Sequence, residues 1–337
     1  MVRRNPLVAV LGGPELFGSF FDRARQQRLG RSFDWIRSAV RKGPALRALL
    51  AEADALVTTW DSPSFGPDLT MLAPRLRLVA HCGGEVKGRF ARSLFDDLTI
   101  VNAPGPMAPY VAELAVTFLL MAARRVDDHR QSLARRSNGV YQEIHLNGCD
   151  RETLRGRSVG LVGLGRIGRG IVEMLRPFGP LVTAYDPYVS ARAAHRLGVR
   201  VASLRPLLAR SEFLVLAAGL TEETRGMIDA RALGRLPDGA TVVNVARGGL
   251  VDLGALTREV RRGRLRCAID VTDPLEPLPV AHPLRRMRGA VVTPHVGAAA
   301  VEVRHQMADK VLDSLEGFFA GRRPATRVTP AMLDLMT

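Results

Sequence analysis

The sequence predicts an α/β protein with two domains, each built on a sheet of mainly parallel strands. Short apolar segments alternate with helical stretches through most of the chain, which is the pattern of parallel sheets covered by helices. The chain has 337 residues, more than one ordinary domain usually contains. Its composition, 47% hydrophobic and 24% charged, is typical of a globular protein with a sizeable core.

The first part of the chain contains four apolar segments that we interpret as strands, at residues 7–11, 55–58, 76–80 and 99–101. A long apolar helix is expected at 110–125. The polar, arginine-rich passage 126–157 is expected to be a connector.

The second part shows the alternation more clearly. Six segments each end at a polar or glycine-containing turn, and these are SVGLVG, LVTAYD, FLVLAAG, TVVNVA, RCAIDV and AVVTPH. Six such strands fit a dinucleotide-binding fold. A last helix at about 300–320 is long enough to return to the first domain. We therefore place the first domain at 1–126 and 297–337 and the second at 127–296.

Cysteine content and the apolar segments argue against several classes of protein. The three cysteines are Cys82, Cys149 and Cys267, and they have no C-x-x-C spacing. We therefore expect the protein to lie in the reducing cytoplasm and to hold no metal ion. The apolar run near the start is short and followed by Gly and Pro, so we expect no signal peptide. The stretch 110–123 is too short to span a bilayer, and no membrane association is expected.

The net charge of +15 raises the possibility of nucleic-acid binding. The positive charge is almost entirely arginine spread from end to end, with lysine only at 42, 87 and 310. No recognition-helix or RNA-binding signature accompanies it. A compositional bias is the simpler explanation, and we expect no nucleic-acid partner.

A glycine motif marks the expected cofactor site. Gly163, Gly165 and Gly168 have the spacing G-x-G-x-x-G directly after a strand, and Arg166 and Ile167 begin the helix that follows. The glycines allow a tight turn, close approach of the backbone to a pyrophosphate, and close packing of helix on strand, while the helix N-terminus attracts phosphate. A glycine-rich turn without a ligand is the alternative.

An acidic residue stands where a dinucleotide site needs one. Asp186 ends the next strand, 23 residues after Gly163, close to the position that binds the adenosine ribose hydroxyls. A carboxylate there repels a 2′-phosphate, and Pro187 offers no cation to replace it. We therefore expect NAD in preference to NADP. The alternative for Asp186 is a turn or helix cap.

Three later segments resemble those of the D-isomer-specific 2-hydroxyacid dehydrogenase family, in that family's order: VVNVARGGLVD, CAIDVTDPLEPLP and AVVTPHVGAA. Further resemblances bring the coverage to about residues 76–311. The resemblance implies a Rossmann NAD-binding domain, a discontinuous flavodoxin-like substrate domain, and an active site between them. It also implies a homodimer and (R)-stereochemistry at the hydroxyl carbon.

The same motifs imply the catalytic residues Arg247, Glu276 and His295. Arginine's fork of donors suits a carboxylate and the adjacent carbonyl oxygen. Histidine exchanges a proton near neutral pH, and a carboxylate bonded to it orients the ring. Taken singly, each residue also has a non-catalytic explanation, as a surface arginine, a loop carboxylate or a turn histidine. Together they lie at strand ends, where open α/β sheets bind ligands.

Four further residues are implied less strongly. Asp270 resembles the position that meets the nicotinamide carboxamide, with a strand-end aspartate held by backbone donors as the alternative, and Thr224 resembles a residue lining the cofactor cleft. Gly83 and Gly84, in HCGGEVK, resemble the loop that holds the substrate carboxylate. Glu85 in that loop and the extra Leu275 before Glu276 depart from the common pattern, which leaves the substrate open.

The sequence thus favours an NAD-dependent oxidoreductase that interconverts a small 2-oxo acid and its (R)-2-hydroxy acid. Formate is disfavoured, because formate dehydrogenases of this fold carry glutamine where Glu276 stands. The alternatives are a nicotinamide-sensing regulator of the corepressor type on the same fold and, less favoured, a nucleic-acid binder.

Overall fold

The computed structural model describes residues 5–135 and 139–334, and the chain divides into two compact units. Unit 1 comprises residues 1–107 and 299–337, and unit 2 comprises 108–298. From the sequence we placed the divisions at 126/127 and 296/297. Helix α6 (Met107–Ala123) belongs almost wholly to unit 2 because its apolar residues pack into that unit's core.

Unit 1 contains a five-stranded sheet in the order β2-β1-β3-β4-β5, with every pair parallel. This order is that of flavodoxin-like folds. The strands are β1 (Leu7–Leu11), β2 (Asp34–Ser38), β3 (Ala55–Thr58), β4 (Leu78–His81) and β5 (Thr99–Asn102). The four predicted strands are confirmed to within two residues. Strand β2 was missed because it is a largely exposed edge strand with the polar sequence DWIRS.

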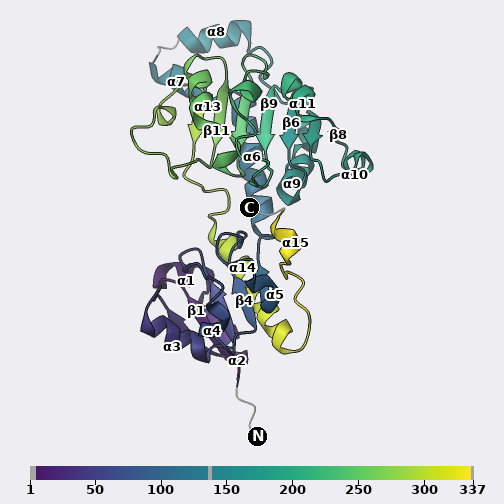
Figure 1. The fold of residues 1–337 in the computed structure, drawn as a ribbon. Coiled ribbons are helices and arrows are strands. Elements are labelled where there is room, and N and C mark those ends of the chain that lie inside the picture. Colours follow the sequence, from purple (N-terminus) through teal and green to yellow (C-terminus); the bar gives the residue numbers. More distant parts are fainter. Residues whose placement is uncertain (1–4, 136–138, 335–337) are drawn as a thin grey trace. The chain divides into compact units, whose positions relative to one another are not determined.

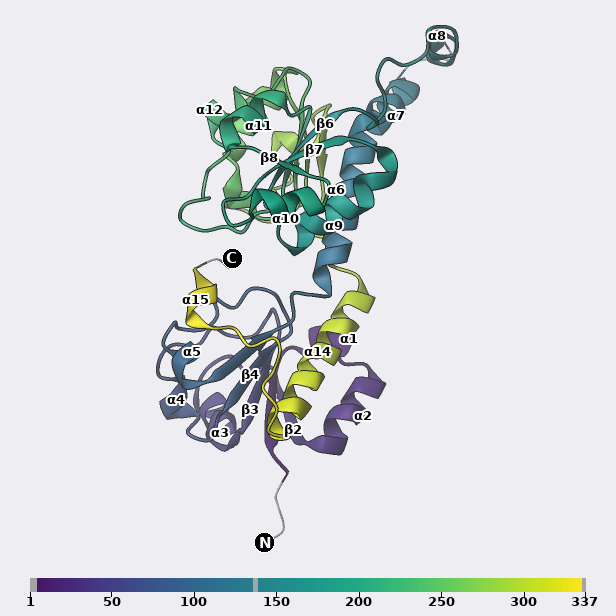
Figure 2. The ribbon, with the colours of Figure 1, turned by 90° about the vertical axis from the view of Figure 1, so that its right-hand side faces the viewer.

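Helices cover both faces of this sheet (Figures 1 and 2). They are α1 (Pro14–Phe20), α2 (Arg23–Ser32), α3 (Pro44–Glu52), α4 (Leu69–Leu72), α5 (Leu94–Asp97), α14 (Val301–Phe319) and α15 (Pro330–Leu333). The C-terminal helix α14 contacts α1, α2 and β4, which confirms that the first domain is discontinuous. Buried residues of α3, α4 and α5 form the core on the other face.

Unit 2 contains a parallel sheet in the order β12-β11-β10-β9-β6-β7-β8. The strands are β6 (Ser158–Val162), β7 (Leu181–Tyr185), β8 (Arg200–Val201), β9 (Phe213–Leu216), β10 (Thr241–Asn244), β11 (Arg266–Ile269) and β12 (Ala290–Val292). All six predicted strands are confirmed. Only β8 was missed, because two residues are too few to show a pattern.

The helices of unit 2 pack on both faces of the sheet, as in a Rossmann fold (Figure 2). One core includes residues of α6, α9 (Arg166–Leu175) and α10 (Ala191–Arg196). The opposite core includes residues of α11 (Leu204–Arg210), α12 (Ala230–Leu233) and α13 (Leu253–Arg261). The described part of the unit also contains the 3-10 turns η1 (Arg176–Phe178), η2 (Gly248–Leu250) and η3 (Pro283–Arg285).

The passage expected to be a connector contains two helices, α7 (Val126–Arg135) and α8 (Gly139–Asn147). Asp128 anchors α7: its buried carboxylate accepts bonds from Arg125 at 3.0 Å and Arg288 at 3.2 Å, and it pairs with Arg266 at 2.8 Å. Arg266 and Arg288 come from distant parts of the chain, so the local polar composition did not reveal the helix.

No single helix in the described part of the chain is long and apolar enough to cross a membrane. Only α6 and α7 taken together pass the length and composition test, and they are bent by 54°.

Candidate active site and cofactor turn

The predicted site residues of unit 2 all follow the carboxyl ends of its strands. Gly163 follows β6, Asp186 follows β7, Thr224 follows β9, Arg247 follows β10, Asp270 and Glu276 follow β11, and His295 follows β12. Because the strands are parallel, these residues share one edge of the sheet. Ligands of open α/β sheets bind at this edge.

The turn between β6 and α9 has the shape that a diphosphate requires. Gly163 has φ of +95°, and a Cβ there would lie 2.6 Å from the backbone nitrogen of Ala218. A Cβ on Gly168 would collide with the carbonyl oxygen of Gly163, so helix and strand approach closely. A Cβ on Gly165 would meet no atom within 4 Å. Open space therefore faces the N-terminus of α9, where the first N–H groups have no intrahelical acceptor.

Asp186 is bonded to this turn. Its carboxylate accepts hydrogen bonds from the backbone N–H of Leu164 at 2.7 Å and of Tyr188 at 2.9 Å. The capping role that we considered as an alternative is therefore present. Each carboxylate oxygen has a second lone pair, so the same group retains capacity to accept from ribose hydroxyls.

His295 and Glu276 form the pair that the motifs implied. His295 Nδ1 lies 2.8 Å from Glu276 Oε2, and Glu276 Oε1 accepts a hydrogen bond from the Thr272 N–H at 3.0 Å. The carboxylate thus joins the imidazole to the loop that follows β11. With Nδ1 occupied, Nε2 is the ring atom that can exchange a proton with another molecule.

Asp270 holds the loop that carries His295. Its carboxylate accepts from Val296 and Gly297 N–H, each at 2.8 Å, and from the Thr293 hydroxyl. Its carbonyl accepts from the His295 N–H at 2.9 Å. Asp270 is buried, and the described structure therefore supports the alternative that we kept open, a strand-end aspartate held by backbone donors.

Arg247 lies at the start of the turn after β10 and is partly buried. Its Nη1 donates to the Ala246 carbonyl at 2.8 Å, and Asn244 Nδ2 donates to the Arg247 carbonyl at 2.9 Å. A Cβ on the next residue, Gly248, would collide with the backbone of Thr272. The Arg247 turn therefore packs directly against the residue whose N–H binds Glu276.

Thr224 stabilises the turn after β9. Its hydroxyl accepts from Thr221 N–H at 2.7 Å and donates to the Gly219 carbonyl at 2.8 Å. These bonds give Thr224 a local structural role beside the expected place near the cofactor.

In unit 1, Gly83 and Gly84 follow β4, as expected. Gly83 N–H donates to the His81 carbonyl at 2.9 Å, whereas Gly84 N–H has no acceptor among the described residues. Gly84 is therefore the better donor to a ligand. Asn102 Nδ2 donates to the Gly84 carbonyl at 2.7 Å and helps to hold the loop.

His81 supports this loop, and sequence reasoning missed it. A Cβ on Gly83 would collide with the His81 ring, whose Nδ1 lies 2.9 Å from the Thr58 hydroxyl. Burial, with a smaller contribution from Arg89, lowers the pKa of His81 from 6.5 to about 3. The ring is therefore neutral at physiological pH. Its only signal in the sequence was its place directly before the glycine loop.

Comparison with known proteins identifies the family. Residues 116–297 match the model of the D-isomer specific 2-hydroxyacid dehydrogenase NAD binding domain, which covers more than half of the chain. The chain belongs to this family. Its unit 2 is therefore an NAD-binding domain, and NAD(H) is its cofactor. The glycine turn, with its positive φ and open space before α9, fits that cofactor.

Individual relatives agree with this placement. The chain is 36% identical over 284 residues to D-3-phosphoglycerate dehydrogenase of Mycobacterium tuberculosis, a match that covers 82% of this chain and 51% of the relative. It thus spans about half the length of that relative. It is 32% identical over 291 residues to glyoxylate reductase of Korarchaeum cryptofilum, covering 84% and 85% of the two chains. A crystal structure of a Thermus thermophilus protein matches with a TM-score of 0.79 and 28% identity, covering 96% of this chain and all of the other.

Proposed function

We propose that this chain is an NAD-dependent dehydrogenase that interconverts a small 2-oxo acid and its (R)-2-hydroxy acid. The observation that supports it most directly is the His295–Glu276 pair, with 2.8 Å between Nδ1 and Oε2, on the sheet edge that also carries the cofactor turn. A bound NAD(H) supplies or accepts the hydride. The remaining requirements are an oriented substrate and a group that exchanges a proton, which protein side chains provide.

Three residues divide these tasks in the proposal. The Arg247 guanidinium orients the substrate carboxylate and polarises the carbonyl oxygen. His295 Nε2 donates a proton to that oxygen during reduction and accepts it during oxidation. Glu276 fixes the ring and favours its protonated form. Gly84 N–H, with Gly83 beside it, is proposed to bind the substrate carboxylate. Asp270, although not in contact with substrate in this proposal, positions the loop that carries His295.

Several expectations stay predictions: preference for NAD over NADP, a homodimer, and location in the cytoplasm. The relatives act, by their names, on phosphoglycerate and glyoxylate. For this chain we propose only the substrate class, a short 2-oxo acid, and neither of those two substrates.

Turnover of a panel of 2-oxo acids tests the proposal. We expect the chain to oxidise NADH steadily with glyoxylate, hydroxypyruvate or a longer 2-oxo acid. His295→Ala should lower kcat by at least about 100-fold, the usual contribution of a positioned acid or base, while NADH binding measured by fluorescence is retained. His195→Ala, which changes an exposed histidine on α10, is the matched control and should leave kcat unchanged.

The outcomes separate the candidate functions. Near-normal turnover by His295→Ala would show that the proton donor is misassigned. NADH binding without turnover of any acid would favour the sensor-type regulator over the enzyme.

A further inference from the structure

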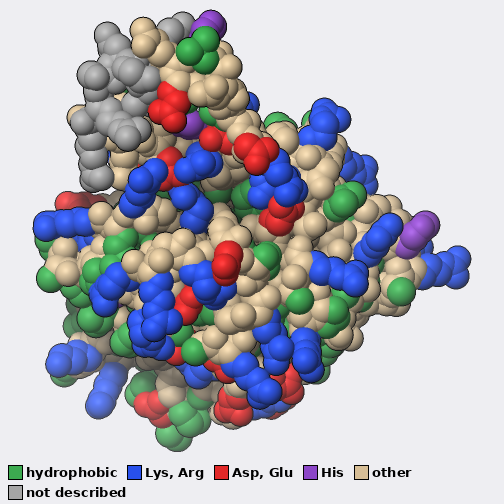
Figure 3. Space-filling view, turned by 90° about the horizontal axis from the view of Figure 1, so that it is seen from above, with side chains coloured by type: hydrophobic (Ala, Val, Ile, Leu, Met, Phe, Trp, Pro, Cys, Tyr) green, Lys and Arg blue, Asp and Glu red, His purple; other side chains and the backbone are tan. Residues whose placement is uncertain are grey.

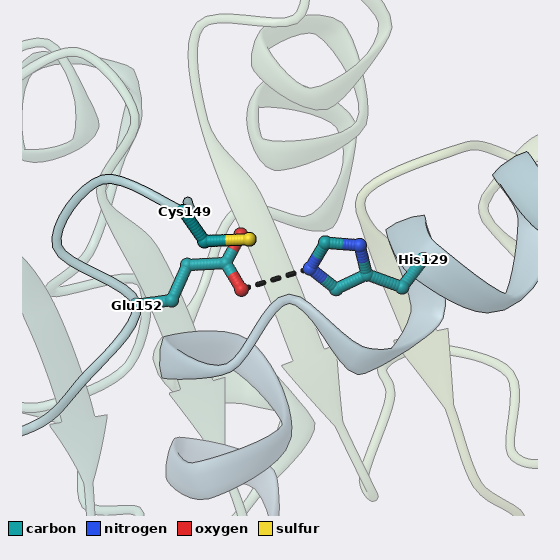
Figure 4. Close-up of side chains that lie close together, drawn as sticks. All are labelled: His129, Cys149 and Glu152. Carbon is teal, nitrogen blue, oxygen red and sulfur yellow. Dashed lines mark hydrogen bonds and ion pairs between the residues drawn. The ribbon is translucent and has the colours of Figure 1, made fainter. Parts of the chain in front are cut away.

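A second cluster of reactive side chains lies in unit 2, apart from the residues of the proposed active site. His129 comes from α7, whereas Cys149 and Glu152 come from the segment between α8 and β6. One ligand atom from each lies within 4.8 Å of the other two. Figure 4 shows the Cys149 sulfur and the His129 ring both directed toward the Glu152 carboxylate.

The three groups are of the types that zinc prefers: a thiol, an imidazole and a carboxylate. Bond lengths of about 2.0–2.3 Å place the ligands of a tetrahedral zinc site about 3.3–3.8 Å apart. His129 Nε2 lies 2.8 Å from Glu152 Oε2, a hydrogen-bond distance that is shorter than the spacing of two zinc ligands, and Cys149 is exposed. Zinc binding would therefore require the imidazole and the carboxylate to separate by about 0.5 Å and the sulfur to move inward.

The local charges also suit a cation. The Glu152 side chain is only 10% exposed, pairs with His129, and forms a longer ion pair with Arg125, with 4.0 Å between Oε1 and Nη1. Arg125 is itself engaged by Asp128, whose Oδ2 accepts from Arg125 Nε at 3.0 Å. The Arg125 guanidinium is thus shared between two carboxylates, and only part of its charge compensates that of Glu152.

We propose that His129, Cys149 and Glu152 form a binding site for Zn²⁺ with one coordination position left to water. The ligands join α7 to the chain that enters β6, so bound zinc would close the loop between residues 129 and 149. Its role would be structural, because none of its ligands belongs to the proposed catalytic set. The expectation of no metal rested on cysteine spacing, which cannot reveal ligands 20 residues apart.

Cobalt substitution tests the site through the sulfur. After chelator treatment, one equivalent of Co²⁺ should produce the near-ultraviolet absorption of a thiolate–cobalt bond, and Zn²⁺ should then displace it. Cys82 and Cys267 are buried, and burial raises the pKa of both thiols, that of Cys267 to about 12. The absorption therefore reports Cys149. Zinc should also raise Tm, because it binds the folded state.

Variants determine whether all three groups bind. We expect Cys149→Ser to abolish the thiolate band. His129→Ala should weaken metal binding by about 100-fold or more, because even the loss of a residue that only hydrogen-bonds to a metal ligand lowers metal affinity by about 10- to 100-fold. His295→Ala and His195→Ala should leave the band and the affinity unchanged. A band that survives in Cys149→Ser, or equal loss of binding in His195→Ala, would overturn the proposal. Absence of any band at one equivalent would show that the cluster is an ion pair only.

Discussion

Individual residues show how function depends on supporting contacts. His295 has φ of +57°, a left-handed conformation that is unusual for any residue except glycine. Strain of this kind persists only where neighbouring contacts impose it. Asp270 supplies them through its carboxylate and its carbonyl, while Glu276 fixes the ring. The backbone of His295 is thus held by contacts other than those of its side chain, and the imidazole is oriented for the role that we propose for it.

His81 gives a prediction about acid stability. Its pKa is about 3 in the folded chain and near the ordinary 6.5 when unfolded. The unfolded chain therefore takes up a proton first, and the free energy of unfolding falls as pH drops from 6.5 toward 3. Between pH 7 and pH 5 the expected loss is about 2 kcal/mol. His81→Gln should lose most of this dependence.

Urea unfolding followed by tryptophan fluorescence measures this effect in the right unit, because both tryptophans, Trp35 and Trp60, lie in unit 1. His195→Gln, on an exposed position of unit 2, is the control. An unchanged pH slope in His81→Gln would mean that His81 is charged or hydrated in the folded protein.

At the scale of elements, the β6–α9 turn and the end of β7 act together. Asp186 binds the turn backbone and is proposed to bind the adenosine ribose as well. Asp186→Ala removes both interactions, whereas Asp186→Asn removes the charge and one of the two oxygens that accept from Leu164 and Tyr188. Because hydrogen bonds to a charged group contribute roughly 1.5–3 kcal/mol, we expect Asp186→Ala to weaken NADH binding by about 10- to 100-fold.

Asp186→Asn should chiefly narrow the preference for NADH over NADPH, because an amide does not repel the 2′-phosphate. Steady-state KM values for both cofactors, with a saturating 2-oxo acid, measure the change. If wild type used NADPH as well as NADH, Asp186 would have only its capping role.

At the scale of the whole molecule, the charge distribution bears on partners. Figure 3 shows cationic side chains spread over one face and interspersed with acidic ones. Many arginines are engaged locally, as Arg28 is with Asp313 and Glu316, both at 2.7 Å. Dispersed charge of this kind attracts polyanions only at low salt.

We therefore expect the chain, with its net charge of +15, to be retained on a DNA column at low salt and released before physiological salt, whatever the DNA sequence. Elution in a salt gradient with two unrelated duplexes measures this. If the chain were retained at physiological salt, and more strongly on one duplex than on the other, the result would support the hypothesis that it is a nucleic-acid-binding protein.

The sequence by itself determined the α/β class, nearly all of the parallel strands and the glycine turn. It also named Arg247, Glu276 and His295 as candidate catalytic residues, and their roles stay a prediction. These features depend on local patterns: apolar segments of strand length, glycines at fixed spacing, and motifs at strand ends. Element boundaries and the helices within 126–157 were less visible, since packing against distant residues such as Arg266 decides them.

Only the tertiary structure decided the contacts between distant segments. It bonded the His81 ring to Thr58, bonded the Asp270 carboxylate to the loop that carries His295, and brought His129 to Cys149 and Glu152. The physical reason is that each contact joins side chains whose separation along the chain carries no pattern. Burial and hydrogen bonding favour such contacts in the folded chain, where the sheets bring their segments together.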